Sequence, residues 1–402
     1  MAFLKIAIIR EGKIPTDKRA PLSPNQALEL QNTFKNVKVV CQQSRVRCFK
    51  NEEYSQVGIP VVNDIYDCDI FLGIKEVPVS NLIGGKIYLF FSHTMKKQEH
   101  NRKLLQTILK KGIHLIDYEA LKDGEGNRLV GFGRYAGIVG SYNALWTYGR
   151  RTGSFVLPRA FTCEGLAGLE DALDKIKIPP VKIVLLGSGR VGKGAIELLT
   201  RAKIKQIMPR DYLEKDFDFP VFTQLTSKDY HVRKDGGKFD RIEFHEYPQH
   251  YQTDFKKFGA VSHVLIVGTY WNPEGPKLFS SEDLISPFKI QVIADITCDL
   301  DGSIPSTKRA SAIDDPVYDY NPYTGEEEPP FSNEKNVNVM AIDNLPCELP
   351  RSSSEDFGKN LMEKVLPHLF AEDEVIDRAT ICRNGKLSGP FSYLNDFVKE
   401  KS

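Results

Sequence analysis

A glycine-rich turn between a strand-like and a helix-like segment constrains the fold of this chain most strongly. The apolar residues 181–186 are followed by Gly187-Ser-Gly189-Arg190-Val191-Gly192, and an amphipathic helical pattern continues through residues 195–199. In this order the first glycine permits a tight turn, the second lets a pyrophosphate approach the backbone, and the third lets the helix pack closely on the strand. The start of the helix also favours negative charge. The motif therefore predicts that a dinucleotide is bound by Gly187, Gly189, Arg190, Val191 and Gly192. The alternative is that these residues form a plain structural turn.

The charge balance excludes some classes of partner. The 402-residue chain has 54 Lys and Arg against 53 Asp and Glu, whereas binding to nucleic acid or a membrane surface would need a basic excess. No apolar run approaches the ~20 residues of a membrane span, and the N-terminal segment lacks the long apolar region of a signal peptide. The seven cysteines are scattered without a C-x-x-C pair, which predicts reduced thiols and neither a disulfide framework nor a metal site. We expect a soluble cytoplasmic protein.

Strand-like runs alternate with helical patterns on both sides of the glycine motif. We expect strands at residues 6–10, 37–42, 69–75, 87–92, 113–118, 204–208, 262–268, 289–296 and 337–342, and helices at 25–34, behind an N-cap at Ser23, and at 96–111. Two segments, residues 211–240 and 299–336, interrupt the alternation and are predicted to be loops. The acidic run 326–328 is expected to be a solvated face of the second loop. Ser353-Ser-Glu-Asp356 predicts a capping box ahead of the final long helix.

This alternation predicts an α/β fold with two Rossmann-like, doubly wound parallel-sheet domains and an active-site cleft between them. We expect a substrate domain over residues 1–140, completed by residues 347–402, and a dinucleotide-binding Rossmann domain over residues 141–346. Nicotinamide chemistry is expected in the cleft, at the carboxyl ends of the strands.

Charged residues end several strands of the first predicted domain. Lys75 closes one strand and is followed by Glu76, and His93 follows the next strand. Because consecutive parallel strands end at one edge of a sheet, Lys75 and His93 are expected to face one crevice as acid–base groups, with a salt-bridged edge lysine as the alternative for Lys75. Arg19 could clamp a carboxylate bidentately. Glu119 ends the last strand of this domain.

At these residues the chain resembles a known family. Gly73-Ile-Lys75-Glu76, Phe90-Phe-Ser-His93, Leu115-Ile-Asp-Tyr-Glu119, Gly131-Phe-Gly133 and Ala341-Ile-Asp343 resemble lysine-forming saccharopine dehydrogenases. They are similar still more closely to the lysine–ketoglutarate reductase half of the bifunctional animal and plant enzyme. The likeness covers about residues 5–395, and the other half of the bifunctional enzyme is expected to be absent. Arg19-Ala-Pro-Leu-Ser-Pro24 is shared more widely, with alanine dehydrogenases and the transhydrogenase nucleotide subunit.

The resemblance implies a reaction. Saccharopine and water would be converted to lysine and 2-oxoglutarate, or the reverse, with hydride transfer to or from NAD(P). Lys75 would take the proton of the secondary amine and His93 would act as general acid–base for water, since two proton transfers need two tuned groups. Arg19 and Arg128 would hold substrate carboxylates, and Glu76 and Glu119 would modulate the catalytic pair. Asp343 would lie near the nicotinamide, with a helix cap as its alternative role.

The coenzyme is predicted from the end of the second strand of the nucleotide domain. Asp211 could accept a hydrogen bond from a ribose 2′-hydroxyl, as in NAD enzymes, whereas Arg210 could meet the 2′-phosphate of NADP. A carboxylate repels a phosphate, so we expect NAD, with NADP as the alternative. Two other functions remain in view: another amino-acid dehydrogenase of the alanine type, and a non-catalytic dinucleotide-binding protein.

Overall fold

The computed structural model describes residues 3–300 and 302–399, which form two compact units. Unit 1 combines Met1–Phe132 with Pro350–Ser402, and unit 2 is Gly133–Leu349. The boundaries lie at 132/133 and 349/350, rather than at 140/141 and 346/347, because one continuous helix, α4 (Gly133–Thr152), begins unit 2. Each unit is an α/β fold with its own sheet of eight strands, most of them parallel.

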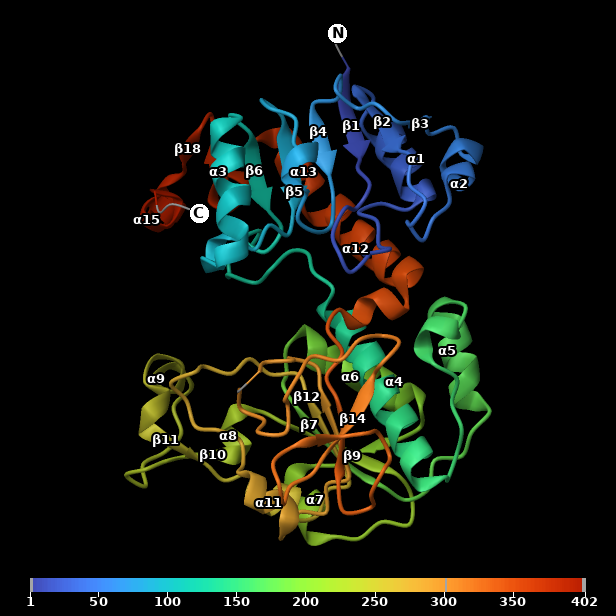
Figure 1. Cartoon of the computed structure of the whole chain (residues 1–402), viewed down its shortest axis with the longest axis vertical. Coiled ribbons are helices and arrows are strands. Elements are labelled where there is room, and N and C mark those ends of the chain that lie inside the picture. The colour runs from blue at the N-terminus through green and yellow to red at the C-terminus, as the bar shows by residue number, and fades with distance from the viewer. Residues whose placement is uncertain (1–2, 301, 400–402) are drawn as a thin grey trace. The chain divides into compact units, whose positions relative to one another are not determined.

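The sheet of unit 1 has the order β18-β17-β6-β5-β4-β1-β2-β3. Its parallel strands are β1 (Leu4–Ile8), β2 (Val37–Gln42), β3 (Val61–Val62), β4 (Ile70–Leu72), β5 (Ile87–Phe90) and β6 (His114–Asp117). Two strands from the C-terminal segment, β17 (Thr380–Arg383) and β18 (Lys386–Leu387), add an antiparallel edge. Within unit 1, Figure 1 shows α3 (Arg102–Lys110) over one face of the sheet and α13 (Leu366–Ala371) behind the strands. Covered faces explain why the central strands are almost wholly apolar.

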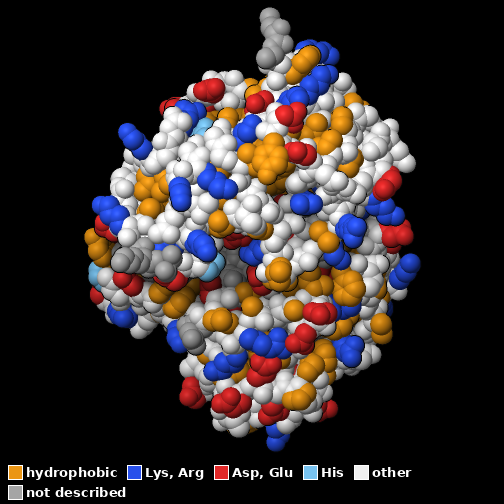
Figure 2. All heavy atoms as spheres, turned by 45° about the horizontal axis from the view of Figure 1, so that its top comes forward, with side chains coloured by type: hydrophobic (Ala, Val, Ile, Leu, Met, Phe, Trp, Pro, Cys, Tyr) orange, Lys and Arg blue, Asp and Glu red, His pale blue; other side chains and the backbone are white. Residues whose placement is uncertain are grey.

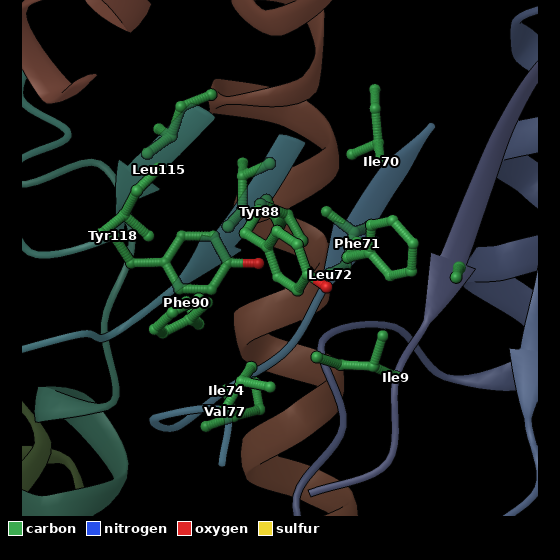
Figure 3. Packing of buried hydrophobic residues seen from close by; sticks show 14 of the residues in the cluster. Ile9, Ile70, Phe71, Leu72, Ile74, Val77, Tyr88, Phe90, Leu115 and Tyr118 are labelled. Carbon is green, nitrogen blue, oxygen red and sulfur yellow. The ribbon is translucent and has the colours of Figure 1, made fainter. Parts of the chain in front are cut away.

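The core of unit 1 continues past the ends of its strands. Phe71 on β4 stacks on Tyr88 of β5, with ring centroids 4.7 Å apart, and Figure 3 shows Ile74 and Val77 below them, near Ile9. Ile74 and Val77 are both buried. The two residues between them, Lys75 and Glu76, are therefore held on a segment anchored at each end by the apolar core.

The helices of unit 1 confirm one predicted cap and contradict another. Ser23 caps α1 (Pro24–Thr33) in a capping box with Gln26, as expected. The capping box predicted at Ser353 is wrong, because α12 (Pro350–Lys364) begins three residues earlier and Ser354 Oγ instead bonds back to Pro350 O at 2.6 Å. Proline fits the first turn of a helix because its missing N–H has no partner there. The other helices of unit 1 are α2 (Asn51–Gln56), α14 (Glu374–Ala379) and α15 (Asn395–Lys399).

The sheet of unit 2 has the order β15-β14-β16-β13-β12-β7-β9-β8. Its parallel strands are β7 (Lys182–Leu186), β8 (Lys205–Gln206), β9 (Val221–Leu225), β12 (Val264–Val267), β13 (Val292–Asp295) and β16 (Val337–Met340). A separate hairpin pairs β10 (His231–Arg233) with β11 (Tyr251–Thr253). The remaining helices are α5 (Gly165–Asp174), α6 (Arg190–Arg201), α7 (Pro209–Glu214), α8 (Ser227–Tyr230), α9 (Arg241–Glu246), α10 (Lys256–Gly259) and α11 (Ser281–Ile285).

The two regions of unit 2 predicted to be loops contain strands, so this prediction is wrong. β9 lies within residues 211–240 and pairs with β7 over five residues. β14 (Val317–Tyr320) lies within residues 299–336, and its partner β15 (Glu327–Glu328) is formed by the acidic run. Short apolar stretches such as Val221–Leu225 form strands here although polar segments surround them, because both of their faces are buried in the sheet.

The surface of the described residues mixes charges of both signs, and the cysteines are unpaired. Figure 2 shows basic and acidic side chains interspersed over the face in view, with no large patch of one sign. Among the described residues no helix is long and apolar enough to cross a membrane, and no group of three or more His, Cys, Asp or Glu could hold a metal ion. All seven cysteines are free thiols.

Candidate active site

Lys75 and His93 lie at the same edge of the unit 1 sheet. Lys75 is the third residue after β4 and His93 the third after β5, and these two strands are parallel neighbours. The pairing continues beyond the strands, since Gly73 N donates to Leu89 O and Phe91 N to Ile74 O, both at 3.0 Å. The expected placement of both side chains at one strand-end edge is therefore present in the backbone.

Glu76 forms an ion pair with His93 at this edge of the sheet. Its Oε1 pairs with His93 Nδ1, and its Oε2 lies 3.2 Å from Lys13 Nζ. Burial alone would raise the pKa of Glu76, but the hydrogen bond and charge of His93, together with Lys13, lower it to about 2. Glu76 is thus a carboxylate at neutral pH. A carboxylate on Nδ1 orients the imidazole and leaves Nε2 for a reactant, as in other acid–base histidines.

Lys75 is a mostly buried lysine whose ammonium group pairs with no carboxylate in the described part of the chain. Burial lowers its pKa, and the positive charges of Arg19 and Lys13 lower it further. A lysine that loses its proton more easily than an exposed one is better suited to act as a base. The structure therefore favours the acid–base interpretation of Lys75 over a salt-bridged edge residue.

Two buried carboxyl groups that the sequence interpretation missed hold the backbone of this edge. Glu11, three residues after β1, accepts from the N–H groups of Ile74 and Lys75 at 2.7 and 2.9 Å, and burial raises its pKa to about 7. Asp117, the last residue of β6, accepts from Ser92 N at 3.0 Å and Glu119 N at 2.7 Å. Their positions at strand ends were the available signal. They fix the segments that carry Lys75, His93 and Glu119.

Glu119 and Arg128 form a second charged pair in this cluster. Arg128 donates to Glu119 Oε1 at 2.6 Å, and Lys96 lies 3.1 Å from the same oxygen. Burial would raise the pKa of Glu119, but Arg128, Lys96 and His93 lower it below its usual value. The other oxygen, Oε2, is buried and accepts no hydrogen bond from the described residues. A buried acceptor without a partner costs stability unless a ligand supplies the donor.

Arg19, expected to hold a substrate carboxylate, already pairs with a carboxylate of the protein. Its guanidinium pairs with Asp17 through two bonds, at 3.0 and 2.5 Å, and lies 4.0 Å above the Phe132 ring. The side chain is only 2% exposed. Asp17 thus occupies the Nε–Nη2 edge of the guanidinium, and the positive charge of Arg19 lowers the pKa of Lys75.

In unit 2 the glycines of the predicted turn have the three expected geometries. Gly187 has φ +115°, and an added Cβ would lie 2.6 Å from Gly268 O. At Gly192 a Cβ would lie 2.2 Å from Gly187 O, whereas at Gly189, the N-cap of α6, it would meet nothing within 4 Å. Protein backbone thus packs against Gly187 and Gly192, whereas the space at Gly189 is open. A pyrophosphate would approach the backbone there. These residues fit a dinucleotide.

Helices α4 and α6 approach each other closely behind the turn (Figure 1). A Cβ at Gly137 would lie 2.0 Å from Val191 O, and one at Gly194 would lie 2.0 Å from Arg134 O. Arg134 also binds Glu197 through two bonds, at 2.8 and 2.6 Å. Val191 packs against Gly268, and Arg190 is exposed at the first position of α6. The close approach fixes the start of α6.

The placement expected for Arg210 and Asp211 is wrong. The strand before them, β8, is an edge strand, and β9 lies between it and β7. Both residues belong to α7, where Arg210 pairs with Glu214 and Asp211 with Lys215, each at 3.0 Å on the surface. In a dinucleotide fold the ribose-binding residue ends the strand that adjoins the glycine strand. That strand is β9.

Asp343 lies just beyond β16, at the carboxyl edge of the unit 2 sheet. Its N–H donates to Ser311 O at 3.1 Å, and its side chain is exposed. The following short 3-10 helix (Leu345–Glu348) is preceded by Asn344 as its N-cap residue, with φ 65°. Because the capping position belongs to Asn344, the alternative role of Asp343 as a helix cap loses support.

Comparisons with known proteins agree with this arrangement. Residues 7–139 match the model of the alanine dehydrogenase/PNT N-terminal domain. The chain is 30% identical to alpha-aminoadipic semialdehyde synthase of Bos taurus over 97% of its own length and 47% of that protein. It is 26% identical to the lysine-forming, NAD(+) saccharopine dehydrogenase of Emericella nidulans, over 91% and 92% of the two chains.

The fold is also that of a solved structure. An L-alanine dehydrogenase superposes with a TM-score of 0.62 at 16% identity, covering 96% of this chain and 97% of that one. The present chain spans about half the length of the semialdehyde synthases that it matches, 47% in the Bos taurus protein. The predicted resemblance is confirmed for the N-terminal domain and for the homology to both groups of proteins.

Proposed function

Because this chain is homologous to lysine-forming saccharopine dehydrogenases and to alpha-aminoadipic semialdehyde synthases, we propose that it interconverts saccharopine with lysine and 2-oxoglutarate. In the oxidative direction saccharopine, water and NAD(P)⁺ give lysine, 2-oxoglutarate, NAD(P)H and a proton. A bound nicotinamide dinucleotide supplies the hydride acceptor, for which the open glycine turn of unit 2 is suited. The charged edge of unit 1 would supply the proton transfers.

The two proton-transfer roles divide between Lys75 and His93. Hydride can leave the glutarate α-carbon only when the secondary amine is neutral, and the neutral form of Lys75 would accept that proton. The resulting imine is hydrated, and His93 would remove a proton from the water and return one to nitrogen as the C–N bond breaks. Glu76 would keep the imidazole oriented throughout. Two groups tuned by different neighbours fit two successive proton transfers.

One observation carries this proposal: Lys75, with a lowered pKa and no carboxylate partner, lies on the same sheet edge as the Glu76–His93 pair. Glu119 Oε2, buried and without a hydrogen-bond donor, suits an ammonium or amine N–H of the substrate. Arg128 is half exposed and would bind a substrate carboxylate while retaining Glu119. Arg19 would contribute charge rather than a direct bidentate contact, because Asp17 occupies its fork.

A panel of coupled assays tests the proposal. NAD⁺ and NADP⁺ are each supplied with saccharopine or alanine, and NADH and NADPH with lysine plus 2-oxoglutarate, and absorbance at the nicotinamide band is followed. We expect turnover with saccharopine, or with lysine plus 2-oxoglutarate, to exceed turnover of alanine by far. Equal or faster turnover of alanine would replace the proposal by an alanine-type dehydrogenase, which the N-terminal domain match favours as second candidate. No turnover with any pair, but tight coenzyme binding, would indicate a non-catalytic dinucleotide-binding protein.

A further inference from the structure

A cavity in unit 1 lies near the sheet edge that carries Lys75 and His93, but neither of these residues lines it. It has a volume of about 210 Å³, and all of its lining residues belong to unit 1. Arg10 lies two residues beyond β1, Gln42 is the last residue of β2, and Asn63 directly follows β3. The cavity therefore lies where these three neighbouring parallel strands end, and it is separate from the proton-transfer groups.

The floor of the cavity is apolar and aromatic. Phe71 and Tyr88 line it with their stacked rings, and Figure 3 shows both close to Ile9 and Val77, which line it as well. All four side chains are buried in the core of unit 1. A concave apolar surface of this kind binds the apolar part of a small ligand.

Tyr88 also carries a hydrogen-bond donor without an acceptor. Its oxygen accepts from Ile83 N at 2.9 Å, but its O–H donates to none of the described residues, although the side chain is only 1% exposed. Burial raises the pKa of this hydroxyl to about 12, and its neighbour Tyr66, which lines the cavity, raises it further, so the proton is retained at neutral pH. A buried donor without a partner costs stability unless a ligand or water accepts from it.

The rim of the cavity carries one positive and one negative side chain. Arg10 and Asp64 are both exposed, and neither forms an ion pair with the described residues. Asp64 Oδ1 accepts from Tyr66 N at 2.9 Å, which leaves Oδ2 for a ligand. The Gln42 carboxamide holds the rim in place, because it accepts from Arg10 N at 3.1 Å and donates to Asn63 O at 3.3 Å.

These features define the class of ligand. A guanidinium and a carboxylate on one rim complement the carboxylate and the ammonium group of a zwitterion, whereas a dianion or a diamine would bring like charges together. The apolar floor favours an apolar side chain on that zwitterion. The volume lies below the range of about 300–1,000 Å³ that is usual for drug-sized ligands, so the ligand is small.

We propose that this cavity is a second ligand site, which binds a free α-amino acid with an apolar side chain. Arg10 and the Tyr88 hydroxyl bind its carboxylate, Asp64 binds its ammonium group, and its side chain packs on Phe71 and Val77. This ligand differs from the proposed substrate saccharopine, which has more charged groups than the rim can pair.

Calorimetric titration of three ligands of similar shape tests the proposal. L-Leucine, isocaproate, which lacks the ammonium group, and isoamylamine, which lacks the carboxylate, are titrated into the full chain without coenzyme. We expect leucine to bind most tightly, because only leucine engages both rim charges. The affinity should also rise from alanine through valine to leucine, by up to about fourfold for each added carbon that is buried. Equal affinities for leucine and isocaproate, or no binding of leucine, would overturn the proposal.

Two rim variants separate the two ends of the ligand. Arg10→Gln should weaken leucine binding by roughly three- to tenfold and leave isoamylamine binding unchanged, and Asp64→Asn should weaken leucine binding as much but leave isocaproate binding unchanged. Arg45→Gln and Asp396→Asn are matched controls, since they remove exposed charges of unit 1 outside the cavity. Unfolding midpoints check that all four variants fold. If the controls weakened leucine binding equally, the effect would be general electrostatics and the proposal would fail.

A last variant distinguishes the cavity from the proposed substrate site. Arg128→Gln alters that site but not the cavity lining, so its affinity for leucine should equal that of the wild type. If Arg128→Gln weakened leucine binding and Arg10→Gln did not, leucine would occupy the substrate site and the proposal would be wrong. Because neither coenzyme nor saccharopine is present, this result is independent of the proposed reaction.

Discussion

In unit 1 the carboxyl edge of the sheet is crowded with charged side chains, whereas in unit 2 the edge beside β7 is built from glycines. At the first edge His93 lowers the pKa of Glu76, and burial together with Arg19 and Lys13 lowers the pKa of Lys75. At the second edge Gly187 and Gly192 work by having no Cβ, because one would meet the backbone at 2.6 and 2.2 Å. The same topological position can thus serve proton chemistry or backbone recognition of phosphate, depending on side-chain size and charge.

The difference also affects how each edge responds to substitution. In unit 1 a changed residue removes a charge from a connected cluster, so neighbouring pKa values change while the backbone, held by Glu11 and Asp117, is retained. In unit 2 an added methyl group forces the backbone to move, so stability and ligand binding change together. Four predictions test this contrast.

The largest expected effect is the loss of acid–base catalysis in unit 1. Lys75→Met and His93→Gln should each lower kcat by roughly 10²–10⁴-fold, because positioned acid–base groups contribute about that much, while coenzyme affinity stays close to that of the wild type. Steady-state kinetics with saccharopine and fluorescence titration of the coenzyme measure the two quantities. The exposed residues Lys103 and His100 supply the controls Lys103→Met and His100→Gln. Wild-type kcat/KM for both site variants would mean that the residues are structural.

The second effect separates two glycines of one motif. Gly192→Ala should destabilise unit 2 by about 1–3 kcal/mol, because its Cβ cannot fit against Gly187 O without a backbone shift, and it should weaken dinucleotide binding as well. Gly189→Ala should leave the unfolding midpoint unchanged, since its Cβ meets no protein atom, but should still weaken binding where the pyrophosphate approaches. Thermal unfolding and coenzyme titration distinguish the two. Equal losses of stability in Gly192→Ala and Gly189→Ala would show that the protein packs against both glycines.

The third effect is a dependence of stability on pH that originates from Glu76. Its folded pKa of about 2 lies below the ordinary value of 4.5. The pair therefore stabilises the fold above about pH 4.5, and this stabilisation is lost as the pH falls from 4.5 towards 2. Glu76→Gln should be less stable than the wild type at pH 6, and the gap should be clearly smaller at pH 3, closing fully only below the folded pKa.

Urea unfolding at each pH measures this gap. The exposed Glu52 on α2 supplies the control Glu52→Gln, which should match the wild type at both pH values. A gap for Glu76→Gln that stays constant down to pH 3 would show that packing, rather than ionisation, explains the loss.

The smallest effect is expected at Asp211. Its ion pair with Lys215 is exposed, and exposed pairs contribute about 0–1 kcal/mol. Asp211→Ala should therefore leave the unfolding midpoint and the ratio of kcat/KM for NADPH and NADH unchanged within twofold. A tenfold change of that ratio would return coenzyme selection to the end of β8.

Much of each site was predictable from local sequence. The order of apolar run, G-x-G-x-x-G and helical pattern predicted the turn of unit 2, and charged residues after apolar runs predicted Lys75 and His93 on one edge. Glu11 and Asp117 were missed because a carboxylate that caps backbone N–H groups looks in the sequence like any other polar residue after a strand. The pairing of Arg19 with Asp17, only two residues away in the chain, was not predicted from the sequence.

The sequence by itself determined the α/β class, the glycine turn and the set of titratable residues at strand ends, because these depend on periodicity and on residues close in the chain. Only the tertiary structure decided that β9, from a segment that looked like a loop, lies between β7 and β8. Strand order results from how distant segments share a buried sheet, and no local pattern encodes it. The pKa of Lys75 was likewise decided in three dimensions, by burial and by Arg19 and Lys13, which lie more than fifty residues away in the chain.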